Sequence, residues 1–191
     1  MDAAQAYEAH AREFLRARDD WIGERAVARW ARGLEEGAAV IELACGSGYP
    51  VTRALSAAGL RLWAVDASPT LLETFRSRFP AIPVQCARVQ ETDFFGRTFD
   101  GAVAIGLVFL LSAADQAALI SKVAAILAPG GRFLFTAPTE TGTWNDLTTG
   151  IECRSLGHAR YKELLHKAGF RVLSAFNDEG MNNHYDVERV G

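Results

Sequence analysis

Several features are scarce in this 191-residue chain, and each scarcity excludes a class of protein. There are only three cysteines, scattered without a CxxC pair, which argues against a disulfide framework or a zinc knuckle and favours a reducing, cytoplasmic setting. The longest apolar run, residues 101–111, is shorter than the roughly 18 residues that a membrane span needs. Neither sign of charge dominates, because the chain has 20 Lys and Arg residues and 23 Asp and Glu residues. We therefore expect neither a nucleic-acid-binding face nor a membrane partner.

Other signals are also missing. The first residues lack the basic and apolar regions of a signal peptide, so we expect none. No linker rich in Pro, Gly or Ser divides the chain, and no two of the four histidines have the spacing of metal ligands, so no metal site is expected. Hydrophobic residues, in contrast, make up 49% of the chain. That share excludes a disordered protein and predicts one domain over residues 1–191 with a sizeable core.

From residue 38 onward, short apolar runs alternate with amphipathic stretches. The runs predict seven strands, over residues 38–43, 60–65, 84–86, 100–105, 132–136, 171–176 and 184–190. Strands separated by helices are typical of βαβ units and a parallel sheet. We predict an α/β fold: a doubly wound, Rossmann-like, mostly parallel seven-stranded sheet in a three-layer α/β/α sandwich. A hairpin-like connection between the last two runs predicts an antiparallel edge strand.

The first predicted strand leads directly into a glycine-containing loop, Glu-Leu-Ala-Cys-Gly-Ser-Gly, at residues 42–48. Doubly wound sheets bind ligands at the carboxyl ends of their strands. Gly46 and Gly48 permit a tight turn and a close approach to a ligand, and the next helix offers free N–H groups. A dinucleotide fingerprint would need a third glycine where Val51 stands. This excludes a nicotinamide-dependent oxidoreductase.

An ordered set of motifs accompanies this loop. The pattern E-x-A-x-G-x-G is followed by Asp66, which lies 20 residues after Gly46 at the end of the second predicted strand. That spacing suits a carboxylate that accepts both hydroxyls of a ribose. Phe-Asp at 99–100 and Leu-Ala-Pro-Gly-Gly at 127–131 precede the fourth and fifth strands. Over roughly residues 38–137, the set resembles the class I S-adenosylmethionine-dependent methyltransferases.

The resemblance implies S-adenosylmethionine as cofactor and S-adenosylhomocysteine as product. In the family, Asp66 would hold the ribose hydroxyls, Ala67 would lie near the adenine, and Glu42 would orient the methionine amino end through the loop. Ala44 stands where the family most often has glycine, and Arg88 stands where it commonly has an adenine-binding Asp. The expected cofactor-binding residues are Tyr7, Glu42, Ala44, Cys45, Gly46, Gly48, Asp66, Ala67, Arg88, Val89, Gln90, Ile105 and Gly106.

Two of these positions have alternatives. Arginine has no acceptor for the adenine amino group, so Gln90 or Glu91 is expected to take that role, with the Val89 N–H serving a ring nitrogen. Cys45 invites interpretation as a nucleophile, but its neighbours are loop glycines and no base is near it in the sequence. We interpret Cys45 as a small loop residue.

The acceptor is expected where residues 143–146 and 182–185 meet at the carboxyl edge of the sheet. Methyl transfer needs positioning and exclusion of water more than a general base. The expected substrate-binding residues are Phe109, Trp144, Asp146, His184 and Tyr185, and Asp146, His184 and Tyr185 are also the catalytic candidates. Each has a structural alternative: Phe109 belonging to the core, Trp144 covering the end of the sheet, or His184 capping a turn.

The chain then divides by role into an N-terminal helical lid at 1–37, a cofactor-binding core at 38–137 and a substrate-side part at 138–191. In the lid, Tyr7 would cover the methionine end, and Arg12 or Arg16 would meet its carboxylate. The predicted function is methyl transfer to N, O or S of a small molecule. The alternatives are a protein or RNA methyltransferase, or a non-catalytic S-adenosylmethionine-binding regulatory module. The oligomeric state stays open.

Overall fold

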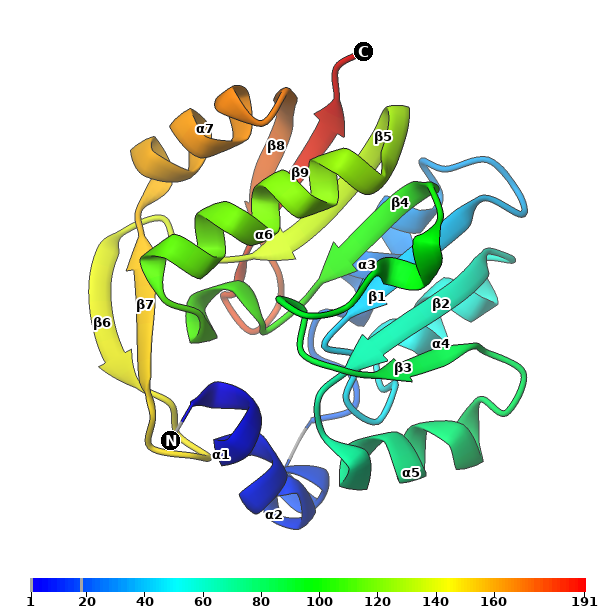
Figure 1. The fold of residues 1–191 in the computed structure, drawn as a ribbon, viewed down its shortest axis with the longest axis vertical. Helices are drawn as coiled ribbons and strands as arrows, with labels where there is room; N and C mark the ends of the chain where they lie inside the picture. Colours follow the sequence, from blue (N-terminus) through cyan, green and yellow to red (C-terminus); the bar gives the residue numbers. More distant parts are fainter. Residues whose placement is uncertain (1, 18) are drawn as a thin grey trace.

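A seven-stranded sheet forms the centre of the computed structural model, which describes residues 2–17 and 19–191 (Figure 1). The strand order is β3-β2-β1-β4-β5-β9-β8. The strands are β1 (Ala39–Leu43), β2 (Arg61–Asp66), β3 (Val84–Cys86), β4 (Phe99–Ala104), β5 (Leu127–Thr136), β8 (Phe170–Asn177) and β9 (Asn183–Arg189). Strands β3, β2, β1, β4 and β5 pair in parallel. The predicted seven-stranded, mostly parallel sheet is confirmed.

The antiparallel part of the sheet is the β8–β9 hairpin. Strand β9 runs antiparallel to both β5 and β8. It therefore lies between them, and β8 forms the edge. The predicted hairpin at this edge is confirmed, but its second strand is an interior strand in which residues 184–187 are buried.

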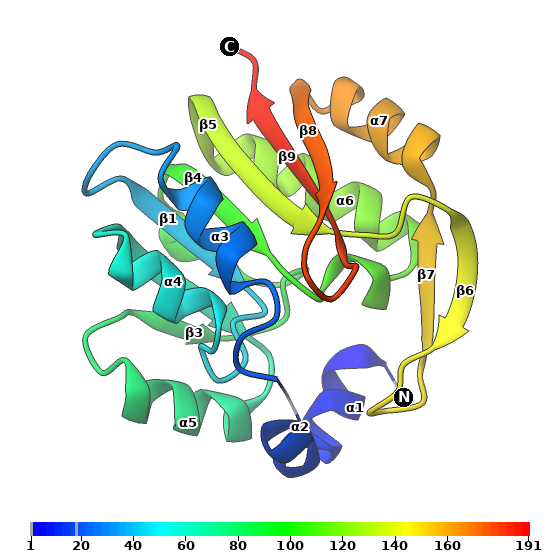
Figure 2. The same cartoon turned by 180° about the vertical axis from the view of Figure 1, so that it is seen from behind.

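Helices cover both faces of the sheet and make the three layers. Helices α3 (Glu24–Ala31), α4 (Val51–Ala57) and α5 (Pro69–Arg78) lie on one face, and α6 (Ala113–Ile126) and α7 (His158–Lys167) lie on the other (Figures 1 and 2). Along β1, Val40 packs toward α3 and α4, whereas Ile41 joins the cluster of α6 and α7. Burial on both faces explains why the parallel strands read as continuous apolar runs.

Capping residues fix where the helices begin. The Ser68 hydroxyl accepts a hydrogen bond from the Leu71 N–H at 3.1 Å, and Pro69 occupies the first turn of α5. The Ser112 hydroxyl accepts from the Asp115 N–H at 3.1 Å at the start of α6. Both starts follow the sequence signals for an N-cap. None of the described helices is long and apolar enough to cross a membrane.

Three further pieces gather at the carboxyl ends of the parallel strands. Helices α1 (Ala3–Ala9) and α2 (Ala11–Ala17) lie between α5 and the tip of a second, two-stranded sheet (Figures 1 and 2). That sheet is the antiparallel hairpin of β6 (Thr141–Asn145) and β7 (Glu152–Leu156), which the sequence pattern did not predict. Short 3₁₀ turns at Phe94–Gly96 (η1) and Val108–Leu110 (η2) complete the fold. Helices α1 and α2 and the β6–β7 hairpin surround the strand ends where a ligand would bind.

Candidate cofactor and substrate site

A cavity of about 790 Å³ lies at the carboxyl ends of the parallel strands. Its walls combine the loop after β1, the ends of β2, β3 and β4, the two N-terminal helices, and the tips of the β6–β7 and β8–β9 hairpins. Ligand sites of proteins usually measure roughly 300–1,000 Å³. The space is thus at the upper end of that range and is large enough for more than one small molecule.

The loop after β1 turns sharply into this cavity. Ala44, Gly46 and Gly48 all have positive φ angles, of 58°, 54° and 88°. A side chain at Gly48 would place its Cβ only 2.4 Å from Phe79 of α5, so glycine there permits close packing of the loop on the helix. Ala44 occupies a left-handed conformation that residues with a side chain adopt only at an energetic cost.

Asp66, at the end of β2, holds this loop through a hydrogen bond to its backbone. The N–H of Gly46 donates to Asp66 Oδ2, and the N–H of Ser68 donates to Oδ1, both at 2.8 Å. The side chain faces the cavity although the residue is only 8% exposed. Burial raises the pKa of Asp66 above its ordinary value, against the opposing effect of the two backbone hydrogen bonds. Each carboxylate oxygen has a second lone pair, so Asp66 can still accept from a pair of hydroxyls.

Glu42 is the second buried carboxylate of the cavity wall. It lies near the end of β1, and its Oε2 accepts a hydrogen bond from the Thr52 hydroxyl of α4 at 2.5 Å. The residue is 3% exposed and faces the cavity. The hydrogen bond from α4 fixes the carboxylate beside the glycine loop.

Residues 87–90 form the wall on the β3 side. Lys122 of α6 fixes this segment, since its Nζ donates to the carbonyl oxygens of Val89, Gln90 and Thr92 at 2.9–3.1 Å. Arg88 points instead to the lid, where its guanidinium meets Asp2 at 2.7 Å. Asp2 also caps α1 by accepting from the Gln5 N–H, so this ion pair joins the segment to the first turn of α1.

Helix α1 covers the cavity and is tied on two further sides. Glu8 accepts hydrogen bonds from the hydroxyls of Ser68 and Thr70 at the start of α5, the latter at 2.6 Å. The Tyr7 hydroxyl donates to Asp146 Oδ2 at 3.1 Å, in the turn that follows β6. Together with the Arg88–Asp2 pair, these contacts tie α1 to the segment after β3, to the start of α5 and to the β6–β7 turn.

Comparisons with known proteins agree with this geometry. Residues 40–131 match the family described as a methyltransferase domain. A probable S-adenosylmethionine-dependent methyltransferase of Mycolicibacterium smegmatis is 28% identical over 148 residues, which cover 74% of this chain and 56% of the relative. The chain therefore spans little more than half the length of that curated relative.

Solved structures share the whole fold. The methyltransferase CcbJ from Streptomyces caelestis superposes with a TM-score of 0.82 at 16% identity, with all of both chains covered. The 1,6-didemethyltoxoflavin-N1-methyltransferase of Burkholderia thailandensis, bound to 1,6-didemethyltoxoflavin and S-adenosylhomocysteine, gives 0.75 at 20% identity and covers 100% of this chain and 92% of its own. This chain thus resembles the S-adenosylmethionine-dependent methyltransferases in a methyltransferase-domain match over residues 40–131 and in its whole fold.

The expected cofactor residues lie together with one exception. All thirteen except Gly48 line the cavity, from Tyr7 of the lid to Ile105 and Gly106 after β4. Gly48 packs against Phe79 instead. The lid arginines, however, do not face the cavity, because Arg12 and Arg16 line a separate surface depression with Glu8 and Glu13. The expectation that one of them meets the methionine carboxylate is wrong.

The expected substrate residues divide into two groups. Phe109 and Asp146 line the cavity. Trp144 lies outside the wall and is 37% exposed, with its ring 5.6 Å from that of Phe109. Trp144 therefore packs against Phe109 without lining the cavity itself.

Tyr185 and His184 lie outside the cavity wall because β9 is an interior strand. Tyr185 is fully buried and stacks on Phe135 at a ring distance of 5.0 Å. Burial and the neighbouring Tyr161 raise the pKa of Tyr185 to about 12, which does not suit a base at neutral pH. Its position is that of a core residue, so we withdraw it as a catalytic candidate.

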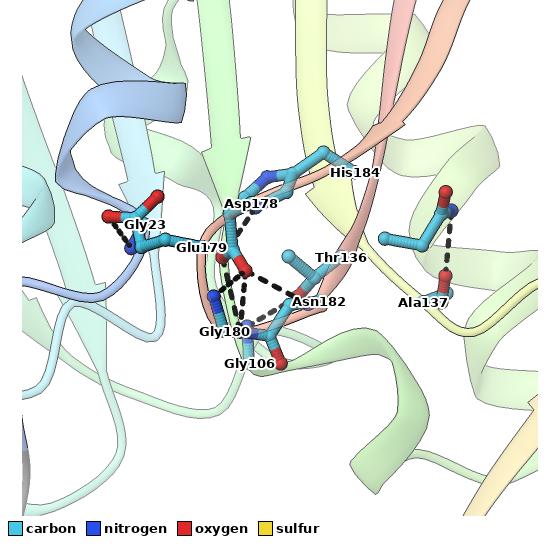
Figure 3. A network of polar contacts seen from close by, with 10 residues as sticks. Gly23, Gly106, Thr136, Ala137, Asp178, Glu179, Gly180, Asn182 and His184 are labelled. Carbon is cyan, nitrogen blue, oxygen red and sulfur yellow. Dashed lines mark hydrogen bonds and ion pairs between the residues drawn. The ribbon is translucent and has the colours of Figure 1, made fainter.

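His184 is also fully buried, and it holds a neighbouring loop (Figure 3). Its Nε2–H donates to Asp178 Oδ2 at 3.0 Å, and its ring stacks on Phe176 at 5.3 Å. Asp178 Oδ1 accepts from the N–H groups of Gly180 and Asn182, both at 2.9 Å. The histidine therefore positions a carboxylate that lines the cavity, and it does not reach the cavity itself.

Sequence reasoning missed several residues of the wall. Asp178 of the β8–β9 tip, Asp19 and Ile22 of the α2–α3 connection, and Asp115 at the start of α6 all line the cavity. The acidic residues read as ordinary turn and capping residues in the sequence. Only the tertiary fold brings these turns to one edge.

Proposed function

We propose that this methyltransferase transfers a methyl group from S-adenosylmethionine to N, O or S of a small molecule. The observation that carries the proposal is the buried Asp66 carboxylate, which faces the cavity and holds the glycine loop through the Gly46 N–H. A buried carboxylate beside a loop with positive φ angles suits the ribose of an adenosine next to its methionyl part.

The residues present fit the cofactor. Asp66 would accept from the ribose hydroxyls, the loop from Ala44 to Gly46 and Glu42 would line the methionine end, and the segment around Val89 would flank the adenine. S-adenosylmethionine supplies an electrophilic methyl group on its sulfonium. The protein must then hold the acceptor in line with this methyl group and keep water away.

The lid and the apolar wall support these two tasks. Helix α1 is tied down by Glu8, by Asp2 and by Tyr7, and it covers the strand ends. Phe109 and Ile151 offer apolar surface to an acceptor. This arrangement supports the proposed division into a lid at 1–37, a cofactor core at 38–137 and a substrate side at 138–191.

A small acceptor is favoured over a macromolecule. Helix α1 is held over the cavity by contacts such as the one between Tyr7 and Asp146, which suits a small acceptor, and the Burkholderia neighbour binds a small heterocycle. A non-catalytic binding module is less favoured, because Glu42, Gly46 and Asp66 are all in place. The three free cysteines support a reducing, cytoplasmic setting as part of the same proposal.

Two measurements test the proposal. Calorimetry should show binding of S-adenosylmethionine and S-adenosylhomocysteine to the purified chain and much weaker binding to Asp66→Ala. Labelled methyl donor is then offered with a small-molecule extract, with a protein mixture and with RNA. Label in the small-molecule fraction alone supports the proposal. Label in protein or RNA overturns the acceptor class, and binding without any transfer supports the regulatory module.

A further inference from the structure

The acceptor side of the cavity is strongly acidic. Five carboxylates line it in addition to those beside the cofactor loop, and they belong to Asp19, Asp115, Asp146, Glu152 and Asp178. Among the described residues of the wall, Arg88 is the one cation, and it is paired with Asp2 at 2.7 Å. No Lys or His of the described chain lines the space. A cleft with carboxylates on several sides concentrates cations and repels anions.

Hydrogen bonds keep one of these carboxylates in the anionic form and fix a second one in its turn. Asp178 is buried, which raises its pKa, but hydrogen bonds from His184 and Asn182 outweigh burial and hold the pKa below its ordinary value. Asp146 Oδ1 accepts from the N–H and the hydroxyl of Thr149 at 2.8 and 2.7 Å. For Asp178, the donors that point at the carboxylate favour its charged form. The negative charge is therefore built into the turns that form the wall.

The same wall also has an apolar part. Phe109, backed by Trp144, and the side chains of Ile22 and Ile151 face the same space. An acceptor that matches both features has an apolar body and a positive charge. Building on the proposed function, we infer that the methyl acceptor is a small cationic amine and that the reaction is N-methylation.

An ammonium group has no lone pair, so it first loses a proton to a carboxylate at the cavity mouth, such as Asp146, and from there to solvent. The nitrogen lone pair forms the new C–N bond, while the electrons of the broken S–C bond stay on sulfur. The products are a methylammonium ion, a neutral thioether and the released proton. The product keeps a positive charge, which the carboxylates also accommodate.

The test compares three probes that share one apolar body: phenethylamine, phenethyl alcohol and phenylacetate. Their binding is measured by calorimetry on the full chain saturated with S-adenosylhomocysteine. We expect the amine to bind at least about tenfold more tightly than the alcohol, with phenylacetate weakest, and we expect added salt to reduce this preference.

A matched pair of variants assigns the preference to the cavity. Glu152 and Glu163 are both exposed and both paired with an arginine, at 2.6 Å in each case, but Glu152 lines the cavity and Glu163 lies on α7. Glu152→Gln combined with Asp146→Asn should reduce the preference for the amine by about fivefold to tenfold. Glu163→Gln should leave it unchanged.

Each outcome decides the inference. Tighter binding of the alcohol or of phenylacetate overturns it, as does failure of all three probes on protein that binds S-adenosylhomocysteine. An amine preference that Glu163→Gln reduces as much as the cavity variants do also overturns it, because the preference would then come from net charge. Loss of S-adenosylhomocysteine binding would instead contradict the proposed function, and that measurement is made separately.

Discussion

Tyr7 and Asp146 meet across the cavity, although 139 residues separate them in the chain. The Tyr7 hydroxyl donates to Asp146 Oδ2 at 3.1 Å, while Asp146 Oδ1 accepts from backbone and side chain in its own turn. The contact links α1, which covers the cofactor loop, to the hairpin that forms the acceptor side. This one contact therefore joins the two sides of the cavity.

This contact predicts the behaviour of Tyr7→Phe. The substitution keeps the ring, which packs edge to face on Phe14 at 5.6 Å, and removes the hydrogen bond to Asp146. A net loss of about 0.5–1.5 kcal/mol should raise the dissociation constant of S-adenosylmethionine and increase hydrogen exchange in residues 3–17. The free energy of unfolding should fall by no more than the same amount. Exchange rates and affinity equal to those of the wild type would show that the contact does not hold the lid.

Asp66→Asn should weaken S-adenosylmethionine binding by about 1–3 kcal/mol, because the amide leaves polar partners unsatisfied. Burial raises the pKa of Asp66, so its carboxylate takes up a proton at a higher pH than an ordinary aspartate, whose pKa is about 3.9. Since the protonated form accepts fewer hydrogen bonds, affinity should fall as the pH drops toward this raised pKa. The variant should lack that part of the pH dependence. Calorimetry across pH measures both effects, and identical profiles would remove Asp66 from the site.

The sequence predicted the parts of the site whose signals are local. The strand at 38–43, the loop that follows it and the Ser68 cap each depend on neighbouring residues, and the structure contains β1, the turn and α5 where these signals lie. Asp66 could be found because a βαβ unit fixes its distance from Gly46. In each case chain geometry links the pattern to the position.

The remaining parts depend on contacts between distant segments. All residues of β6 are exposed, so no apolar alternation marks this strand of the β6–β7 hairpin in the sequence. His184 and Tyr185 were expected to meet an acceptor at the carboxyl edge of the sheet, but β9 lies between β5 and β8 and its residues 184–187 are buried. Asp178 looked like a turn former. Only the folded chain shows that its turn reaches the cavity wall.

Ala44→Gly tests the strain in the cofactor loop. Ala44 has a φ of 58°, a conformation that costs an L-residue about 1–2 kcal/mol and glycine nothing. Glycine loses more backbone entropy on folding, by about 0.5–1 kcal/mol. The free energy of unfolding should therefore rise by about 0.5–1 kcal/mol, with cofactor affinity retained. Urea denaturation with Ala67→Gly as control checks this, and a destabilised Ala44→Gly protein would show that the methyl group is needed for packing.

The pair of His184 and Asp178 makes the sharpest distinction between a structural and a catalytic role. His184→Phe preserves stacking on Phe176 and removes the hydrogen bond to Asp178, whose side chain is only 2% exposed. Leaving a buried carboxylate with one donor fewer should lower the free energy of unfolding by about 1–3 kcal/mol. Turnover per folded molecule should stay within about twofold, because His184 does not line the cavity.

The pH dependence of this destabilisation identifies Asp178 as its cause. Burial raises the pKa of Asp178, but hydrogen bonds from His184 and Asn182 outweigh burial, so the folded-state pKa lies below that of the unfolded chain. A depressed carboxyl pKa contributes stability that is present above the unfolded pKa of about 3.9 and is lost as the pH falls through the folded value. The difference in unfolding free energy between wild type and His184→Phe should therefore be full at pH 7 and shrink below about pH 4. Urea denaturation across this range measures it. A pH-independent difference would exclude Asp178 as the partner that matters, and a large loss of turnover without loss of stability would restore His184 as a catalytic residue.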